Sequence, residues 1–311
     1  MALTSIITVN YNQPGVTLDL LESIKKNCQT DDIEVILVDN ASDVDHKSLF
    51  ADCYPSLRYI RSEVNLGFAG GNNLGIRQAK GEYILMINND TEIIPGFVGQ
   101  LVAEMIARPE IGILSPLILF YDDPRVIQYA GFTPLNLITG RNRTIGLGTQ
   151  NNNQYDNTSY QTAFCHGAAM MCRKSDITHI GLIPEQYFLY YEELDWCEMF
   201  KRAGKQIWFT GKTHIFHKES MSVGKESAVK TYFVTRNRLL FMRRNTNWLN
   251  VTLFSAYYLL LAVPKQLITY LVKGRKDLIP FVAKGLSWHL FRSKNHVEQR
   301  SPLVLQAKSI K

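Results

Sequence analysis

The chain has 311 residues, of which 46% are hydrophobic and 20% charged, and this composition excludes a disordered or low-complexity protein. Its five scattered cysteines form no C-x-x-C pair, which argues against a disulfide or zinc framework and indicates a reducing compartment. The net charge of +6 is divided unevenly: residues 1–231 hold 20 basic and 26 acidic residues, whereas the residues from Tyr232 onward hold 14 basic and two acidic ones. An acidic body therefore carries a basic tail, and charge alone does not choose between nucleic acid, anionic lipid and acidic protein as its partner.

The first third of the chain alternates strand-like and helix-like segments. Strands are predicted at 5–10, 34–40, 57–62 and 83–87, with an amphipathic helix at 15–28 and a glycine-rich entry to another helix at 65–81. Nearly continuous apolar strands between helices are typical of a parallel sheet covered on both faces, so we expect an α/β fold. The N-terminus enters a strand at once, and we therefore expect no secretory signal.

Polar residues follow three of these predicted strands. The clusters are Asn10-Tyr11-Asn12, Asp39-Asn40 and Asn88-Asn89-Asp90. Each could be an ordinary solvated turn, since Asn and Asp are favoured there for backbone reasons. Ligands of open α/β sheets, however, bind beyond the carboxyl ends of the strands, and three such clusters together favour one shared site.

The second half of the body is less regular. A strand is predicted at 112–120, followed by an excursion to Tyr160 that is long for a loop and is expected to hold a small hairpin or a mobile lid. Strand character returns at 163–174, a helix is predicted to start near Glu192, and 206–220 reads as a final strand and turn.

The basic tail begins with an amphipathic stretch at 230–245. An apolar run from Trp248 to Val263 follows, and it is shorter than the roughly 20 residues that a spanning helix needs. Pro264 is expected to break it. Aromatic residues among the apolar ones, with Arg and Lys on both flanks, favour an element at the surface of a membrane. A helix packed on the body or against a second copy of the chain is the alternative, and a nucleic-acid role does not account for the apolar run.

The residue types in these clusters suggest a chemistry. A carboxylate at a strand end suits Mg²⁺ or Mn²⁺, which accept one or two carboxylates and complete their shell with water and phosphate oxygens. Asp90 is the strongest candidate ligand and Glu92 a weaker one. The segment "NLGFAGGNNLG" offers close backbone approach to phosphates or sugars, but it is neither a G-x-G-x-x-G fingerprint nor a P-loop, which disfavours dehydrogenases and P-loop enzymes.

Five segments in order, "SIITVNYN", "VILVDNASD", "NLGFAGGNNLGI", "GEYILMINND" and "YYEELDW", resemble the family 2 inverting glycosyltransferases of the GT-A fold, with the rhamnosyltransferase-like branch of bacteria nearest. The resemblance covers residues 3–245. It implies a mostly parallel sheet flanked by helices, with a catalytic domain at 1–230, divided into a nucleotide-sugar half to about residue 95 and an acceptor half. A basic, aromatic-rich helical region at 231–311 follows.

The resemblance also implies roles for single residues. Asp39 matches the carboxylate that contacts the nucleotide base, and Asn88-Asn89-Asp90 stands at the D-x-D position, where Asn88 replaces the first carboxylate and leaves Asp90 as the main metal ligand. The nucleotide-sugar set implied in this way comprises Asn10, Asn12, Asp39, Asn40, Gly67, Gly70, Gly71, Asn73, Asn89 and Asp90.

On the acceptor side, Glu192-Glu193 matches the family's acidic pair, and Glu193 would be the general base. The alternative for Glu193 is a first-turn carboxylate that the helix dipole favours. His217 would contact the metal or the diphosphate, with His214 as the competing choice, and His166 and Gly167 would shape the acceptor side together with Glu192. Asp195 is expected to brace its helix. Arg236 and Arg238 are expected to reach a diphosphate or anionic lipid.

The resemblance thus predicts transfer of a sugar, with rhamnose the first choice, from a dTDP- or UDP-sugar to a lipid-linked glycan precursor. The reaction would use Mg²⁺ or Mn²⁺ at the inner face of the cytoplasmic membrane, and a homodimer is a further expectation. Two alternatives stand beside it. A non-catalytic scaffold of the same fold is suggested by the missing D-x-D carboxylate. A glycoside hydrolase needs an acid–base pair at a set separation and leaves the glycine-rich segment unexplained.

Overall fold

The computed structural model describes residues 2–29, 32–218 and 227–297. Its first part follows the predicted alternation closely. The elements are β1 (Thr4–Asn10), α1 (Pro14–Asn27), β2 (Ile33–Asn40), α2 (Lys47–Cys53), β3 (Arg58–Ser62), α3 (Gly67–Gln78) and β4 (Tyr83–Ile87).

The remaining elements of the body complete the sheet. They are β5 (Thr91–Ile93), α4 (Phe97–Ala107), β6 (Ile111–Phe120), β7 (Ile127–Tyr129), β8 (Ser159–Gln161), β9 (Ala169–Arg173), α5 (Lys174–Ile180), the 3₁₀ turn η1 (Glu185–Tyr187), α6 (Glu192–Arg202) and β10 (Gln206–His217). The described C-terminal region is helical: α7 (Ala228–Asn245), α8 (Trp248–Tyr257), a π-helical turn η2 (Tyr258–Ala262), α9 (Val263–Val272), a 3₁₀ turn η3 (Lys276–Leu278) and α10 (Ile279–Phe291).

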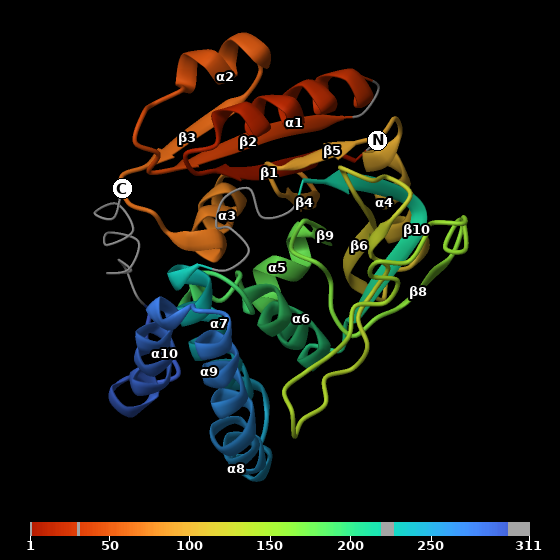
Figure 1. Ribbon diagram of the computed structural model, residues 1–311. Coiled ribbons are helices and arrows are strands. Elements are labelled where there is room, and N and C mark those ends of the chain that lie inside the picture. Colours follow the sequence, from red (N-terminus) through yellow and green to blue (C-terminus); the bar gives the residue numbers. More distant parts are fainter. Residues whose placement is uncertain (1, 30–31, 219–226, 298–311) are drawn as a thin grey trace.

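One mixed sheet runs through the body in the order β3-β2-β1-β4-β9-β6-β10-β5, with β7 beside β6 and β8 beside β10 (Figure 1). The pairings β1–β2, β1–β4, β2–β3 and β6–β10 are parallel and contain most of the paired residues, while β9 runs antiparallel between β4 and β6. Large apolar side chains are buried on both faces, including Leu21 and Phe97 on one and Trp196 and Phe200 on the other. The predicted α/β fold is confirmed.

The strand register brings the predicted polar clusters to one edge. Asn10 and Asp39 are directly paired at the ends of β1 and β2, and β4 lies on the other side of β1. Parallel strands end at the same edge of a sheet, so the residues after β4 lie there too. This arrangement is the one that the sequence pattern predicted.

The excursion after β6 is an irregular hairpin. Antiparallel bridges join Val126 to Gln150, Phe132 to Thr144 and Asn136 to Arg141 in succession, so the chain turns back at residues 137–140. Backbone hydrogen bonds from Asn136 N to Arg141 O, 2.9 Å, and from Gly140 N to Asn136 O, 2.8 Å, close the turn. The expectation of a small hairpin is confirmed, and in Figure 1 this hairpin extends from the sheet toward the C-terminal helices.

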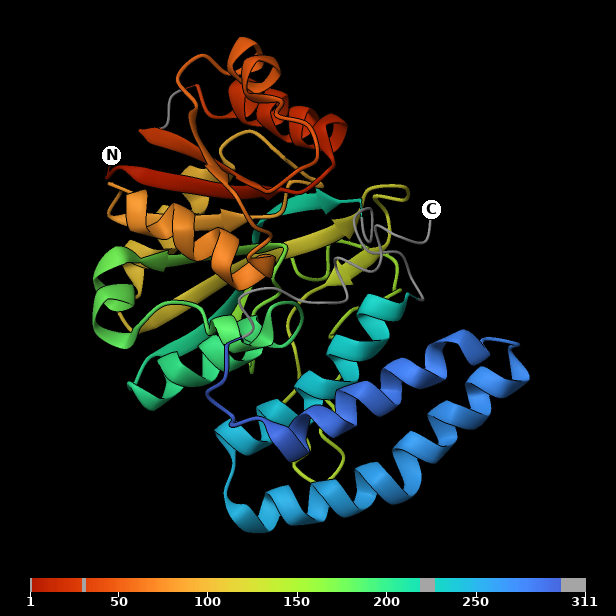
Figure 2. The same ribbon diagram turned by 90° about the vertical axis from the view of Figure 1, so that its left-hand side faces the viewer.

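The C-terminal helices form a layer beside the body (Figure 2). The expected break at Pro264 is wrong: α8, η2 and α9 form one helical run from Trp248 to Val272. Proline lacks an N–H, and its ring crowds the carbonyl four residues earlier. Here the backbone N–H of Val263 bonds Tyr258 O five residues back, and this widened turn next to Pro264 lets the helix continue.

Candidate active site

Asp39 lies buried at the end of β2 and accepts three hydrogen bonds. The donors are Asn10 Nδ2 at 2.8 Å, Arg61 at 2.9 Å and the backbone N–H of Ser42 at 3.2 Å. The Arg61 guanidinium also donates to Ser42 O at 2.7 Å, which fixes it beside the carboxylate. Sequence reasoning found Asp39 and Asn10 but missed Arg61 and Ser42, although Arg61 stands opposite Asp39 in the β2–β3 register.

A chain of hydrogen bonds connects Asp39 to the segment after β4. Asn10 Oδ1 accepts from Thr17 Oγ1 at 3.0 Å, and Asn89 Nδ2 donates to Thr17 Oγ1 at 2.9 Å. Thr17, which the sequence analysis did not single out, lies on α1 and joins the two predicted clusters. Asp90, the next residue after Asn89, is therefore placed at the same end of the sheet as Asp39.

The remaining residues of the predicted nucleotide-sugar set support the local backbone. Asn40 Nδ2 donates to Gly67 O at 3.0 Å and to Asn65 Oδ1 at 3.1 Å, while Asn12 exchanges hydrogen bonds with Asp43. Both polar ends of the Asn73 side chain bond Ile183, and its Nδ2 also donates to Glu185. A direct contact of these residues with a nucleotide sugar stays a prediction.

The glycines of the α3 segment allow close packing. Gly67 has φ +70°, and a Cβ there would lie 2.1 Å from the carbonyl oxygen of Phe188. A Cβ at Gly71 would lie 2.9 Å from Val9 on β1, and one at Gly70 would meet Leu66 at 2.7 Å. Any side chain at these positions would clash with the neighbouring atoms. The glycines are therefore explained by the close packing of α3 against the strands and against the segment that leads to α6.

Asp90 faces a histidine in an arrangement that needs a positive charge. His217 Nε2 lies 3.2 Å from Asp90 Oδ1, and that buried oxygen has no hydrogen-bond partner. His217 Nδ1 lies 2.9 Å from Gln128 Oε1, which only accepts, so Nδ1 carries a proton. In the neutral imidazole the lone pair on Nε2 then points at a carboxylate. Either a proton on Nε2 or a bound cation must separate the two acceptors.

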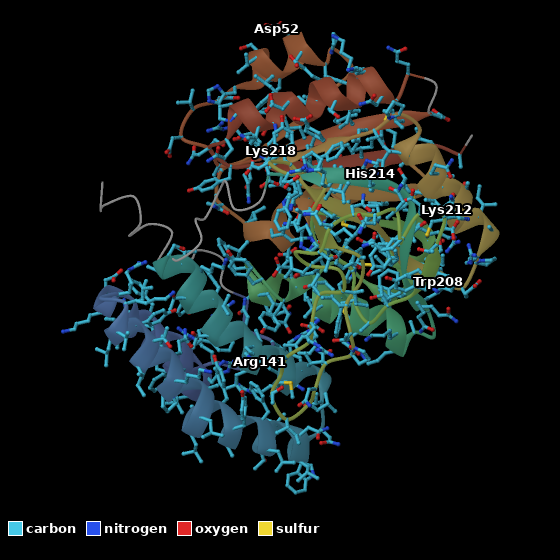
Figure 3. The ribbon with its side chains drawn as sticks, turned by 45° about the vertical axis from the view of Figure 1, so that its right-hand side comes forward. Asp52, Arg141, Trp208, Lys212, His214 and Lys218 are labelled. Carbon is cyan, nitrogen blue, oxygen red and sulfur yellow. The ribbon has the colours of Figure 1, made fainter. Side chains whose placement is uncertain are left out.

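The structure distinguishes the two candidate histidines on β10. His217 is buried beside Asp90, whereas the ring of His214 packs against Phe216 and no hydrogen bond or ion pair joins it to Asp90. Figure 3 shows His214 and Lys218 near the same end of β10. Lys218 bonds Glu92 at 2.8 Å, and this ion pair engages the weaker candidate ligand from the sequence.

His166 stands next to His217, with 5.9 Å between the ring centroids. Burial, reinforced by the nearby His217, lowers the pKa of His166 to about 3, so its ring is neutral. Its Nδ1 accepts from Ala168 N at 3.1 Å, which leaves a proton on Nε2. His166 is thus a neutral hydrogen-bond donor between the Asp90 region and the acidic pair.

Gly167 lies next to the side chain of Glu193, the second member of the acidic pair. A Cβ on Gly167 would lie 4.0 Å from Glu193 Cγ and 3.6 Å from the Phe68 ring. The Glu193 side chain therefore lies beside the segment that carries His166. A succession of neighbouring side chains thus connects Asp39, Asp90 and Glu193, which are far apart in the sequence, and their action on one shared ligand stays a prediction.

The two carboxyl groups of the acidic pair differ in their surroundings. Both begin α6, but Glu192 is 2% exposed, whereas Glu193 stays partly accessible. Burial raises the pKa of Glu193 to about 7, against the hydrogen bonds that backbone N–H groups donate to its ionised form. Burial and then the charge of Glu193 raise the pKa of Glu192 well above its ordinary value. Glu193 is the member that can exchange a proton near neutrality.

The segment before Glu192 is strained and braced from α7. Phe188, Tyr190 and Tyr191 have φ values of 64°, 69° and 77°, a region that costs a non-glycine residue energy. The two N–H groups of Asn237 are shared among the carbonyls of Tyr187, Leu189 and Tyr190, at 3.0, 2.7 and 2.8 Å.

Arg236 strengthens the same brace. It is fully buried and donates to Gln186 O at 2.9 Å and to Tyr187 O at 2.6 Å. Arg238 donates to Thr139 O in the hairpin turn at 2.5 Å. The expectation that Arg236 reaches a diphosphate or lipid is therefore wrong, because its guanidinium is committed to the backbone that presents the acidic pair.

Asp195 is confirmed as a brace outside the reacting groups, since it is buried in an ion pair with Arg244 on α7. Among the described residues, no group of three or more His, Cys, Asp and Glu side chains could hold a metal ion. A cation at Asp90 and His217 would thus have two protein ligands and would take its other ligands from elsewhere.

Comparison with known proteins gives a consistent result. Residues 5–181, more than half of the chain, match the family model described as Glycosyl transferase family 2. The chain is 29% identical over 241 residues to the low-salt glycan biosynthesis hexosyltransferase Agl10 of Haloferax volcanii, covering 76% of this chain and 74% of the relative. It is 22% identical over 263 residues to an N-acetylglucosaminyl-diphospho-decaprenol L-rhamnosyltransferase of Mycobacterium tuberculosis, covering 78% and 85%.

A solved structure extends the likeness to the fold. The mannosyltransferase PcManGT of Pyrobaculum calidifontis, in complex with GDP-Man and Mn²⁺, superposes with a TM-score of 0.56 at 16% identity, covering 98% of this chain and 79% of that one. At this identity the likeness shows a shared GT-A architecture.

Proposed function

The chain belongs to glycosyl transferase family 2 and is a glycosyltransferase, and from this premise we propose that it transfers a sugar from a nucleoside-diphosphate sugar to a hydroxyl of a glycan precursor in one inverting step. The observation that carries the proposal is the convergence of Asp39, the Asp90–His217 pair and Glu193 around one site. A scaffold without activity would not need a partly accessible carboxyl with a pKa of about 7 there.

Glu193 acts as the general base. Its ionised carboxylate takes the proton of the acceptor hydroxyl while that oxygen forms a bond to the anomeric carbon of the donor. The bond from this carbon to the diphosphate oxygen breaks on the opposite face, and the nucleoside diphosphate leaves with the electron pair. A base with a pKa near the working pH contributes roughly 10²- to 10⁴-fold to such a step.

Asp90 and His217 would hold a divalent cation, Mg²⁺ or Mn²⁺. The orphaned Oδ1 of Asp90 and the lone pair of His217 Nε2, 3.2 Å apart, fit this group. When bound, the cation stabilises the negative charge that develops on the leaving diphosphate. The ring of His166, whose Nε2 carries a proton, lies 5.9 Å from that of His217.

Asp39 binds the base of the nucleotide. Its carboxylate, held by Arg61 and Asn10, can accept the N3–H of a pyrimidine base. The donor we propose is therefore a dTDP- or UDP-sugar, with dTDP-rhamnose the first choice. The rhamnosyltransferase named above supports this choice.

The acceptor we propose is lipid-linked, with His166, Gly167 and Glu192 on its side of the site. Relatives named for glycan biosynthesis and for a decaprenol-linked substrate support it. The enzyme would then work at the inner face of the cytoplasmic membrane, where such an acceptor is tethered.

A donor panel tests the proposal. The melting temperature of the purified protein is measured with dTDP-, UDP- and GDP-sugars, with and without Mn²⁺. Separate unheated samples are assayed for release of nucleoside diphosphate. A matching donor should raise the melting temperature, since ligand at about 100 times its Kd adds about 2.7 kcal/mol.

Two substitutions on α6 test the base. Glu193→Gln should abolish transfer and keep the thermal shift, while Glu198→Gln, which removes a carboxylate paired with Lys201 on the same helix, should keep both. Turnover by Glu193→Gln at the wild-type rate would refute the base. No nucleotide release with any donor would favour the scaffold.

A further inference from the structure

Exposed apolar side chains recur along the whole length of the helix Trp248–Val272, with the exposed polar residues Thr252, Lys265 and Thr269 among them. At a rise of 1.5 Å per residue, its 25 residues span about 37 Å. Only 17% of its most apolar window is buried inside the protein. Exposed large apolar side chains recur along it, among them Trp248, Leu249, Leu253, Leu260, Ile268 and Val272.

The inward face of the same helix is fastened to the enzyme. Phe254, Tyr258 and Val263 are buried, and the Tyr258 hydroxyl donates to Thr235 O on α7 at 3.1 Å. The outward stripe is therefore held in a fixed position relative to α7, the helix that braces the segment before Glu193. Figure 2 shows this helix at the outer border of the C-terminal layer.

The hairpin after β6 adds to the same face. A Cβ on Gly140 would lie 2.6 Å from the Phe254 ring, and Thr139 O accepts from Arg238. The turn residues Leu137 and Ile138 are exposed next to this contact. Figure 3 places Arg141, at the end of the turn, against the C-terminal helices. Two segments more than 100 residues apart thus present apolar side chains together.

Positive charge lies on the stripe and at its C-terminal end. Residues 248–297 contain seven Lys and Arg residues and one acidic residue, Asp277. Lys265 is exposed on the helix itself, and Lys273 and Lys276 are exposed at its end. An apolar stripe that carries lysines on it and at its end complements an anionic lipid surface, where the apolar side chains enter the headgroup region and the cations meet the phosphates.

We propose that the exposed stripe of Trp248–Val272, together with the turn 137–140, is a docking face that lies in the plane of an anionic lipid bilayer. The proposal rests on the proposed function in one respect, because it names the surface that brings the enzyme to a lipid-linked acceptor. The helix does not span the bilayer. Spanning would carry the Arg238 guanidinium, which lies over the Phe254 and Tyr258 rings, and the neighbouring α7 and α10 into hydrocarbon.

The docking face is close to the reacting groups. Arg238 bridges the hairpin turn and the helix rings, and it stands one residue after Asn237. Burial raises the pKa of Tyr191 to about 12, and the positive charges of Arg238 and Arg141 partly offset that rise. Both arginines therefore lie within electrostatic range of the residue that precedes the acidic pair. Docking sets Glu193 near the membrane, where an acceptor head group is held.

Vesicle binding tests the face with a matched pair of substitutions. The full chain is sedimented with vesicles of phosphatidylcholine alone and of phosphatidylcholine mixed with phosphatidylglycerol. Ile268 on the face and Ile106 on α4 are 60% and 62% exposed. Wild type and Ile106→Glu should bind the mixed vesicles, more weakly in high salt. Ile268→Glu and Leu260→Glu should each bind at least about tenfold less.

Two further measurements make the result decisive. Ile268→Glu should keep the wild-type melting temperature and the wild-type transfer rate to a water-soluble acceptor, which separates docking from catalysis. Failure of the wild type to bind mixed vesicles, or equal binding by wild type and both face variants, would overturn the proposal. A dimer that Ile268→Glu dissociates, with no vesicle binding, would also overturn it and assign the face to a second copy. An enzyme that binds vesicles but transfers no sugar would refute the proposed function alone.

Discussion

At the scale of single residues, Glu193 should govern the pH dependence of the reaction. Burial raises the pKa of its carboxyl from 4.5 to about 7, and only the ionised form accepts a proton. Below about pH 7, kcat/KM should therefore fall about tenfold per pH unit. Burial and then the charge of Glu193 raise the pKa of Glu192 well above its ordinary value. A profile of kcat/KM measured from about pH 5 to about pH 8 checks this.

The raised pKa of Glu193 makes the folded protein less stable as pH rises, whereas it makes the reaction faster. A carboxyl whose pKa is raised on folding binds more protons in the folded chain than in the unfolded one. The free energy of unfolding should thus decline as pH rises from about 4.5 through about 7, with the contribution of Glu193 fully lost above that window. Glu193→Gln should weaken this decline. A kcat/KM profile that is flat through pH 7 would contradict the assignment.

The Asp90–His217 pair predicts a metal response that can be measured without turnover. Added Mn²⁺ should raise the melting temperature of the wild type in the presence of nucleoside diphosphate. Asp90→Asn and His217→Ala should each lose most of that increase, because the two ligands face each other across 3.2 Å. His214→Ala is the matched control and should keep it. A full metal response in Asp90→Asn would show that the pair is held by a proton.

Residue types at strand ends were sufficient to single out Asp39 and Asp90 and to place them at one edge of the sheet, whereas Glu193, at the start of α6, was singled out by the resemblance to a known family. The partners Arg61, Thr17 and Gln128 were not predictable, because each belongs to another element and only the packing of that element brings it near. For Arg236, the sequence suggested a ligand contact that the structure does not have. Its charge suggested an anionic ligand, whereas the fold buries it against backbone carbonyls.

At the scale of elements, α7 should control the placement of Glu193 through Asn237. Asn237→Ala would remove the side-chain donor from the carbonyls of Leu189 and Tyr190, in a segment that contains three left-handed residues, while Tyr187 O would keep its hydrogen bond from Arg236. Unpaired buried carbonyls cost about 1–3 kcal/mol each, so the melting temperature should fall. Displacement of the base should lower kcat roughly ten- to hundredfold and leave the donor KM nearly unchanged.

The control for Asn237 lies on the same helix. Asn245 bonds Arg202 near the end of α7, and Asn245→Ala should keep kcat. The pH profile separates a positioning role from a general loss of stability. Asn237→Ala should shift the apparent pKa of kcat/KM away from about 7, since the burial of Glu193 depends on this segment. An unchanged profile and kcat would rule out the brace.

Elements were predictable where the apolar pattern was regular. The four strands and α1 of the first third lie within a residue or two of the predicted bounds, but α3 ends three residues before the predicted stretch and α2 was not predicted. The helix Trp248–Val272 was not predictable, because a proline normally ends a helix and the widened turn that accommodates Pro264 has no clear sequence signature. Likewise, the pattern left a small hairpin or a mobile lid open after β6 and did not show that this segment reaches the C-terminal helices.

At the scale of the whole molecule, the division of charge suggested a body with a separate tail, and the boundary drawn at residue 230 remains a prediction. The structure joins the two parts. The segment before Glu192 is held by α7, and α7 is covered in turn by α10, where His289 Nε2 bonds Arg236 O at 2.9 Å and the Trp288 ring lies 5.1 Å from the Arg236 guanidinium. The C-terminal helices thus carry the proposed docking face and also support the segment before Glu193.

This dual role predicts that the C-terminal helices cannot be removed as a simple anchor. A chain ending at Thr246 would lose the buried side chains Phe254, Tyr258, Val282 and Trp288. At about 1.5–3 kcal/mol each, their burial is comparable with the whole stability of a typical protein, about 5–15 kcal/mol. The truncated chain should therefore melt far lower and transfer little sugar even to a water-soluble acceptor. Leu260→Glu combined with Ile268→Glu, which alters only the exposed stripe, should keep that activity. A truncated chain as active and as stable as this double variant would show that the body is independent and that α7 alone holds Glu193.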